Sequence, residues 1–137
     1  MTIVIDTNVL VSAVINPAGA PGTIADLAVN GRLIAAFDRR MWEEYEEVLH
    51  RPKFHFATPV VTHMLASIHR RGRNVRNSSF VRLLPDRTDE PFLEAAVAAP
   101  AEFLVTGNVR HFPVEKICGV RVVTPAEFVE IWKTTAC

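Results

Sequence analysis

The apolar positions of this chain form two kinds of pattern, short continuous runs and stripes at helical spacing. Apolar runs are typical of buried strands, and they predict strands over residues 2–6, 32–37, 103–106 and 120–123, with a short edge strand over 80–84; the last two runs are each broken by one arginine. Helical spacing predicts helices over residues 8–15, 23–30, 38–50 and 91–99, and further helices that begin at residues 58 and 124. Strands that alternate with helices predict an α/β fold with a parallel sheet covered on both faces.

Local signals mark several ends of the predicted helices. Gly31 occupies the position of a left-handed C-terminal cap behind the second helix, and Asp38 is suited to cap the third. Thr124 and Glu127 form a capping box at the start of the last helix. No internal repeat or low-complexity tract interrupts the pattern, which predicts one domain over residues 1–137.

Composition narrows the class of protein. The chain has 137 residues, of which 49% are hydrophobic and 22% charged, enough for one globular core. Two cysteines without a CxxC pair, and no signal peptide before the first strand, favour a cytoplasmic protein. No apolar stretch approaches the roughly 20 residues of a membrane-spanning helix, so we expect no membrane partner. The five histidines lack HxxxH and HExxH spacing, which argues against a zinc site.

Charge is balanced overall and uneven locally. Fifteen basic residues against fifteen acidic ones argue against nucleic-acid binding by bulk charge. Residues 70–87 nevertheless carry six arginines and one acid, together with glycine, asparagine and serine. This composition predicts an exposed basic segment.

Asp6 is the residue that packing explains least. It directly follows the apolar run Ile3–Ile5, and a buried carboxylate without a partner is costly. Either it caps the helix that follows or a cation lies beside it. Ligands of parallel sheets collect beyond the carboxyl ends of the strands, and residues 106–108 (Thr-Gly-Asn) follow a second strand. We therefore expect Asp6 and the Thr-Gly-Asn turn to share one edge of the sheet.

Two further acidic groups are candidates for the same edge. In the helix over 38–50 the apolar stripe consists of Met41, Tyr45, Val48 and Leu49. Glu44 and Glu46 border opposite sides of this stripe, and periodicity does not choose between them. Asp89 stands before the apolar face opened by Phe92 and Leu93, where it either caps that helix or faces the site.

Five stretches in sequence carry a resemblance: IVIDTNVLVSA, EEYEEVLHRPKF, DRTDEPFLEAA, FLVTGNVRHFP and VVTPAEF. In this order and spacing they resemble the PIN-domain family of nucleases, in particular the VapC-like ribonuclease toxins of bacterial toxin–antitoxin pairs. The resemblance implies a three-layer α/β/α sandwich around a parallel sheet of four to five strands. It also implies a cluster of acids that binds Mg²⁺ or Mn²⁺. Matched position by position, these acids are Asp6, Glu44 and Asp89, which resolves the choice between Glu44 and Glu46.

The fourth position of the resemblance departs from the commonest pattern. Where many relatives have aspartate, this chain has Asn108, an amide that can ligate Mg²⁺ without adding charge. The formal charge of the ligand set is then −3, which favours one metal ion over two.

The expected activity is hydrolysis of RNA by a metal-activated water, with Asp6, Glu44 and Asp89 as catalytic ligands and Asn108 as an auxiliary one. The polar residues expected to orient these ligands are Thr7, Asn8, Ser12 and Thr106. The residues expected to contact RNA phosphates are Arg110, His111, Arg73 and Arg76.

The resemblance further implies a small antitoxin partner that covers the acidic edge, and pairing of the chain with itself through apolar helices. Two other functions stay open on the sequence. A catalytically degenerate PIN fold would serve as an RNA- or protein-binding module, as Asn108 and the zero net charge suggest. An aspartate after the first strand also opens phosphatases of the haloacid-dehalogenase type, but those carry a second acid where this chain has Asn8.

Overall fold

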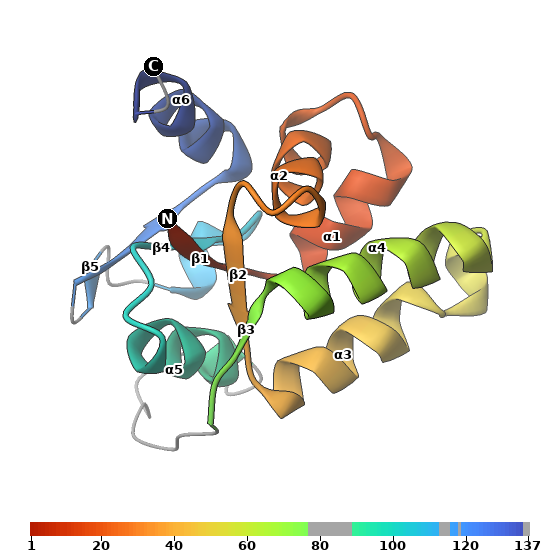
Figure 1. Ribbon diagram of the computed structural model, residues 1–137, viewed down its shortest axis with the longest axis horizontal. Helices are drawn as coiled ribbons and strands as arrows, with labels where there is room; N and C mark the ends of the chain where they lie inside the picture. Colours follow the sequence, from red (N-terminus) through yellow and green to blue (C-terminus); the bar gives the residue numbers. More distant parts are fainter. Residues whose placement is uncertain (77–88, 113–115, 118, 136–137) are drawn as a thin grey trace.

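A mainly parallel sheet forms the centre of the protein (Figure 1). The structure is a computed structural model, and it describes residues 1–76, 89–112, 116–117 and 119–135. Its strand order is β3-β2-β1-β4-β6-β5. The strands are β1 (Thr2–Ile5), β2 (Ile34–Phe37), β3 (Arg73–Asn74), β4 (Phe103–Val105), β5 (Lys116–Ile117) and β6 (Val120–Val123). Every neighbouring pair is parallel except β5 with β6. The predicted α/β fold with a parallel sheet is confirmed, with a short antiparallel strand added at one edge.

Helices cover the sheet on both sides. They are α1 (Thr7–Ile15), α2 (Ala20–Val29), α3 (Arg39–Leu49), α4 (Thr58–Arg71), α5 (Glu90–Ala98) and α6 (Pro125–Thr135). Two short 3₁₀ helices, η1 (Pro52–Phe54) and η3 (Val109–His111), follow α3 and β4. Helix α5 packs against β1, β2 and β4, and Figure 1 shows it on the opposite side of the sheet from α1, α2 and α4. This is the layering expected of a sheet whose strands are apolar on both faces.

The core explains the continuous apolar runs. In β1, Ile3, Val4 and Ile5 are each at most 1% exposed, because helices cover both faces of this strand. In α3 the apolar stripe behaves as predicted at Met41, Tyr45 and Leu49, which are buried. No helix among the described residues is long and apolar enough to cross a membrane.

The sequence signals at helix ends agree with the structure in most cases. Gly31 adopts a left-handed backbone with φ of 76°, and the Asp38 side chain accepts a hydrogen bond from the Met41 N–H at 3.0 Å. Thr124 and Glu127 bond each other's backbone N–H at 3.1 and 2.9 Å, as a capping box does.

Differences from the predicted elements occur where the pattern is short. Helix α2 begins at Ala20, three residues before the predicted start, and it has a proline in its first turn. Proline is tolerated there because the first N–H groups of a helix have no helical partner, so the N–H that proline lacks is not missed. Strands β3 and β5 have two residues each, too few to show a pattern, so the sequence did not predict them. Arg73 therefore lies in a strand at the sheet edge, whereas the predicted strand over 80–84 lies outside the described residues.

The strand register places four polar residues in a row at the carboxyl edge of the sheet. Ile5 lies beside Val105, and Val105 lies beside Val123. The parallel hydrogen bonding continues one residue further, since the N–H of Asp6 donates to Val105 at 2.9 Å. The residues that follow β2, β1, β4 and β6 are, in spatial order, Asp38, Asp6, Thr106 and Thr124. This edge carries the candidate site.

Candidate functional site

Asp6 lies at the centre of this edge and is held by polar side chains. Its carboxylate accepts a hydrogen bond from the Thr106 hydroxyl at 2.7 Å and one from the Asn8 amide at 3.3 Å. It is only 6% exposed and makes no capping hydrogen bond to α1, although it occupies the N-cap position. Capping therefore does not explain Asp6.

Glu44 reaches the same edge from α3. The Thr7 hydroxyl donates a hydrogen bond to its carboxylate, which joins the start of α1 to the middle of α3. The rotation of α3 is fixed by buried Tyr45, whose hydroxyl donates to the backbone oxygen of Ile5 at the end of β1. Glu46 lies two residues on, contacts Trp42 at 2.7 Å, and lines a different cavity. The packing of the helix thus chooses Glu44 for this edge.

Asp89 approaches from the N-terminus of α5 and contacts a histidine. Its carboxylate lies 2.9 Å from Nδ1 of His111, on η3, and its side chain is 14% exposed. Like Asp6, it stands at an N-cap position without making a capping hydrogen bond.

The acids at this edge are buried close to one another, which disfavours their charged forms. Burial raises the pKa of Asp6, and the charge of Asp89 raises it further, against the lowering effect of the Thr106 hydrogen bond. Burial also raises the pKa of Glu44, with the charge of Asp6 acting in the same direction and the Thr7 hydrogen bond opposing it. Burial raises the pKa of Tyr45 well above its ordinary value, and the charges of Asp6, Glu44 and Asp38 act in the same direction. A cation in this place would relieve the repulsion between the acids.

One cleft of about 440 Å³ brings the three acids together. Its lining consists of Asp6, Thr7, Asn8, Val11, Ser12, Glu44, Val48, Arg51, Phe54, Asp89, Asn108 and His111. In the described parts of the chain, no group of three or more His, Cys, Asp or Glu side chains is arranged to hold a metal ion as it stands. The carboxylates instead bond to the neighbouring hydroxyl and imidazole groups. The donor set fits a hard cation by its chemistry, because it consists of carboxylate and amide oxygens.

A family model described as PIN domain matches residues 2–110. The chain belongs to the PIN-domain family. PIN domains are in general nucleases and typically use divalent metal ions. No curated protein and no solved structure gives a significant match to the chain.

Within this PIN domain, the polar residues expected to orient the acids have distinct positions. Thr7 and Thr106 bond Glu44 and Asp6, and Ser12 lines the cleft. Asn8 has a second contact, since its amide oxygen accepts the Gly107 N–H at 3.0 Å and thereby ties α1 to the turn after β4.

The residues expected to contact RNA are spread more widely. Asn108 and His111 lie between the acidic cleft and a second cavity of about 540 Å³, which Arg110 also lines. Arg73 and Arg76 are exposed at the β3 edge of the sheet and do not line the acidic cleft. Their contact with RNA stays a prediction.

The sequence did not reveal two contacts that support this edge of the sheet. Tyr45 was interpreted only as part of an apolar stripe, although a buried tyrosine hydroxyl needs a partner, which signals a polar neighbour. The contact between His111 and Asp89 joins segments 22 residues apart and has no local signal.

Proposed function

We propose that this PIN domain is a Mg²⁺- or Mn²⁺-dependent endoribonuclease that hydrolyses phosphodiester bonds of RNA. One observation carries the proposal: the buried carboxylate of Asp6 caps no helix and shares a cleft with Glu44 and Asp89. These three acids come from distant parts of the chain, so a role in local structure does not account for their convergence. Membership of a family of nucleases supports the same conclusion.

Asp6, Glu44 and Asp89 would hold the cation, with the amide oxygen of Asn108 as an auxiliary ligand. A cation bound by such ligands supplies an activated water and neutralises charge on the phosphoryl oxygens. The protein holds the carboxylates in place through hydroxyl groups, since Thr106 bonds Asp6 at 2.7 Å and Thr7 bonds Glu44. Three carboxylates and one amide favour a single cation.

Positive groups at the rim of the cleft would receive the substrate. Arg51 lines the cleft and Arg110 the adjoining cavity, and both side chains reach solvent. A guanidinium group suits phosphate oxygens because it donates two parallel hydrogen bonds. Arg73 and Arg76 would contact a longer RNA that crosses the sheet edge.

The test is cleavage of a panel of single-stranded and structured RNAs with and without Mn²⁺. We expect the wild type to cleave only with the cation, and Asp6→Asn to lose more than about 100-fold, since removal of outer partners of metal ligands already costs 10–100-fold. Glu44→Gln and Asp89→Asn should behave in the same way.

Two matched controls make the test specific. Asp26→Asn changes an exposed aspartate of α2 outside the cleft, and Glu46→Gln changes the glutamate that α3 turns away from it. Both should cleave like the wild type. Cleavage that persists in Asp6→Asn, or in excess chelator, would contradict the proposal. RNA binding without cleavage would favour the binding module, and a phosphorylated Asp6 would favour the phosphatase.

We further propose that the enzyme is the toxin of a toxin–antitoxin pair and forms a homodimer. The resemblance to VapC-like toxins supports the first role. Exposed apolar side chains support self-pairing, namely Ile15 of α1 at 63% and Val60 of α4 at 54%. Growth arrest on induction that Asp6→Asn abolishes, and a dimer mass by light scattering, would support these roles. Normal growth or a monomer would contradict them.

A further inference from the structure

The sequence assigns His111 to RNA contact, yet its ring faces one of the acids. Nδ1 of His111 lies 2.9 Å from Oδ2 of Asp89, and the histidine side chain is 46% exposed. An ionised carboxylate only accepts hydrogen bonds, so Nδ1 carries the proton and donates. We infer that His111 is a positioning residue, which holds the Asp89 carboxylate in the orientation needed for cation binding; this inference rests on the proposed function.

The backbone that presents His111 is well anchored. The N–H of His111 donates to Asn108 at 2.9 Å, and the next residue, Phe112, is buried at 1% exposure. The turn before η3 is tied to α1 by the Asn8 amide, which accepts the Gly107 N–H. An imidazole on such a turn has a defined position relative to Asp89.

His111 also completes a regular arrangement around the cleft. Thr106 donates to Asp6, and Thr7 donates to Glu44. Each of the three proposed carboxylate ligands is therefore contacted by a polar side chain from a different part of the fold. Partners of this kind fix the orientation of metal ligands, and their loss typically costs 10–100-fold in metal affinity or activity.

The test is Mn²⁺ affinity by calorimetry, measured without RNA on the full chain. We expect His111→Ala to weaken Mn²⁺ binding by about 10-fold or more. His111→Asn should recover most of the affinity, because its amide nitrogen is attached to Cγ as Nδ1 is. His111→Gln, whose amide lies one bond further out, should recover little. His63→Asn, at an exposed position of α4, is the control and should bind like the wild type.

The outcomes separate this inference from the proposed function. If His111→Ala binds Mn²⁺ like the wild type and only the KM for RNA rises, His111 contacts substrate and the inference is wrong. If His111 positions Asp89 as we infer, saturating Mn²⁺ should restore kcat in His111→Ala, and KM for RNA should stay unchanged. If wild type and Asp6→Asn bind Mn²⁺ equally, the cleft is not the metal site, and both proposals fail together. Thermal unfolding checks that each variant is folded. If His111→Ala does not fold, His111→Gln is compared with His111→Asn in its place.

Discussion

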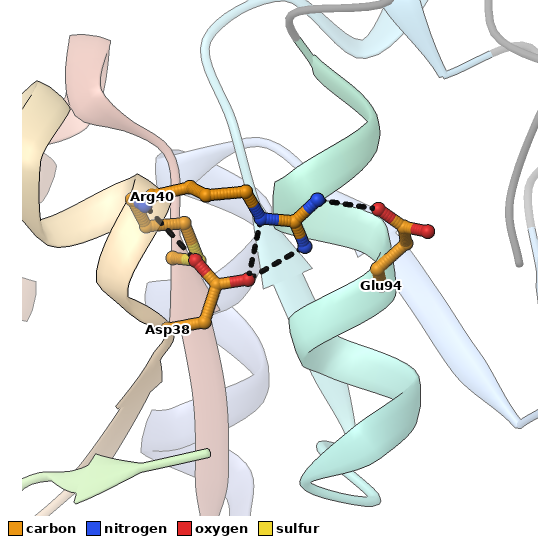
Figure 2. A network of polar contacts seen from close by, with 4 residues as sticks. Asp38, Arg40 and Glu94 are labelled. Atoms are coloured by element: carbon orange, nitrogen blue, oxygen red, sulfur yellow. Dashed lines mark hydrogen bonds and ion pairs between the residues drawn. The ribbon is translucent and has the colours of Figure 1, made fainter. Parts of the chain in front are cut away.

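An ionic network between α3 and α5 should contribute measurably to stability. Figure 2 shows the guanidinium of Arg40 between two carboxylates. It contacts Asp38 at 2.7 Å and Glu94 at 3.1 Å, and Asp38 also accepts the Met41 N–H at 3.0 Å. The carboxylate side chains are 1% and 3% exposed, and that of Arg40 is 33% exposed. The substitution Arg40→Met tests this network, because it keeps most of the apolar stem and removes the charge.

The size of the effect follows from these exposures. Removing one partner of a fully buried ion pair costs about 3–5 kcal/mol, because the remaining charge stays buried without compensation. Solvent reaches a third of Arg40 and screens part of its interaction, so we expect a loss of about 2–3 kcal/mol. At roughly 3 °C per kcal/mol for a chain of this size, the melting temperature should fall by about 6–9 °C.

Urea unfolding followed by tryptophan fluorescence and circular dichroism measures this change, with the midpoint expected to fall at constant m-value. The neighbouring Arg39 provides a matched control, because its 2.9 Å contact with Glu43 joins side chains that are 84% and 66% exposed. Arg39→Met should cost less than about 0.5 kcal/mol. Adding Asp38→Asn to Arg40→Met should recover part of the loss, since it neutralises the buried acid. Equal stability of Arg39→Met and Arg40→Met would contradict this prediction.

Three other outcomes are expected. Burial raises the pKa of Asp6 above its ordinary value. The favourable contribution of Asp6 to folding stability is therefore complete below its unfolded-state pKa and is lost as the pH rises through its folded-state pKa. Melting temperatures in chelator should decline less with pH in Asp6→Asn than in the wild type, and parallel curves would contradict this. Gly72→Ala should lose about 1–3 kcal/mol in urea unfolding, because a Cβ there would lie 2.5 Å from a β2 carbonyl oxygen and 2.6 Å from an α4 one. Gly19→Ala should lose less, because the nearest atom to its Cβ would be a side-chain nitrogen at 3.1 Å. Thr124→Ala removes the 3.1 Å hydrogen bond to the Glu127 N–H and should cost about 1 kcal/mol by the same assay, whereas an unchanged midpoint would show that the cap is dispensable.

Much of the fold could be predicted because its signals are local. A continuous apolar run identifies a buried strand, and β1, β2 and β4 show one, whereas the run of β6 is broken by the exposed Arg121. Caps such as Asp38 and the Thr124 box act within four residues, so the chain itself displays them. Two-residue strands such as β3 and β5 exist only because a neighbouring strand is present to pair with them.

The candidate site is different, because its contacts join distant residues. The sequence placed Asp6 and Thr106 at one edge of a parallel sheet, and the structure brings them to 2.7 Å across 100 positions. Periodicity did not choose between Glu44 and Glu46, which border opposite sides of the same apolar stripe, and only the family resemblance indicated Glu44. That choice follows from how Tyr45 anchors α3 to the end of β1.

The order of the longer strands and helices, the acids available for chemistry and the edge at which two of the polar segments meet can all be inferred from the chain alone. Which side chains face the cleft and what they contact depends on how the whole chain packs, as in the contact of His111 with Asp89. The physical reason is that periodicity describes one element at a time. The rotation of a helix, and the approach of a loop to it, depend on the packing of the remaining chain.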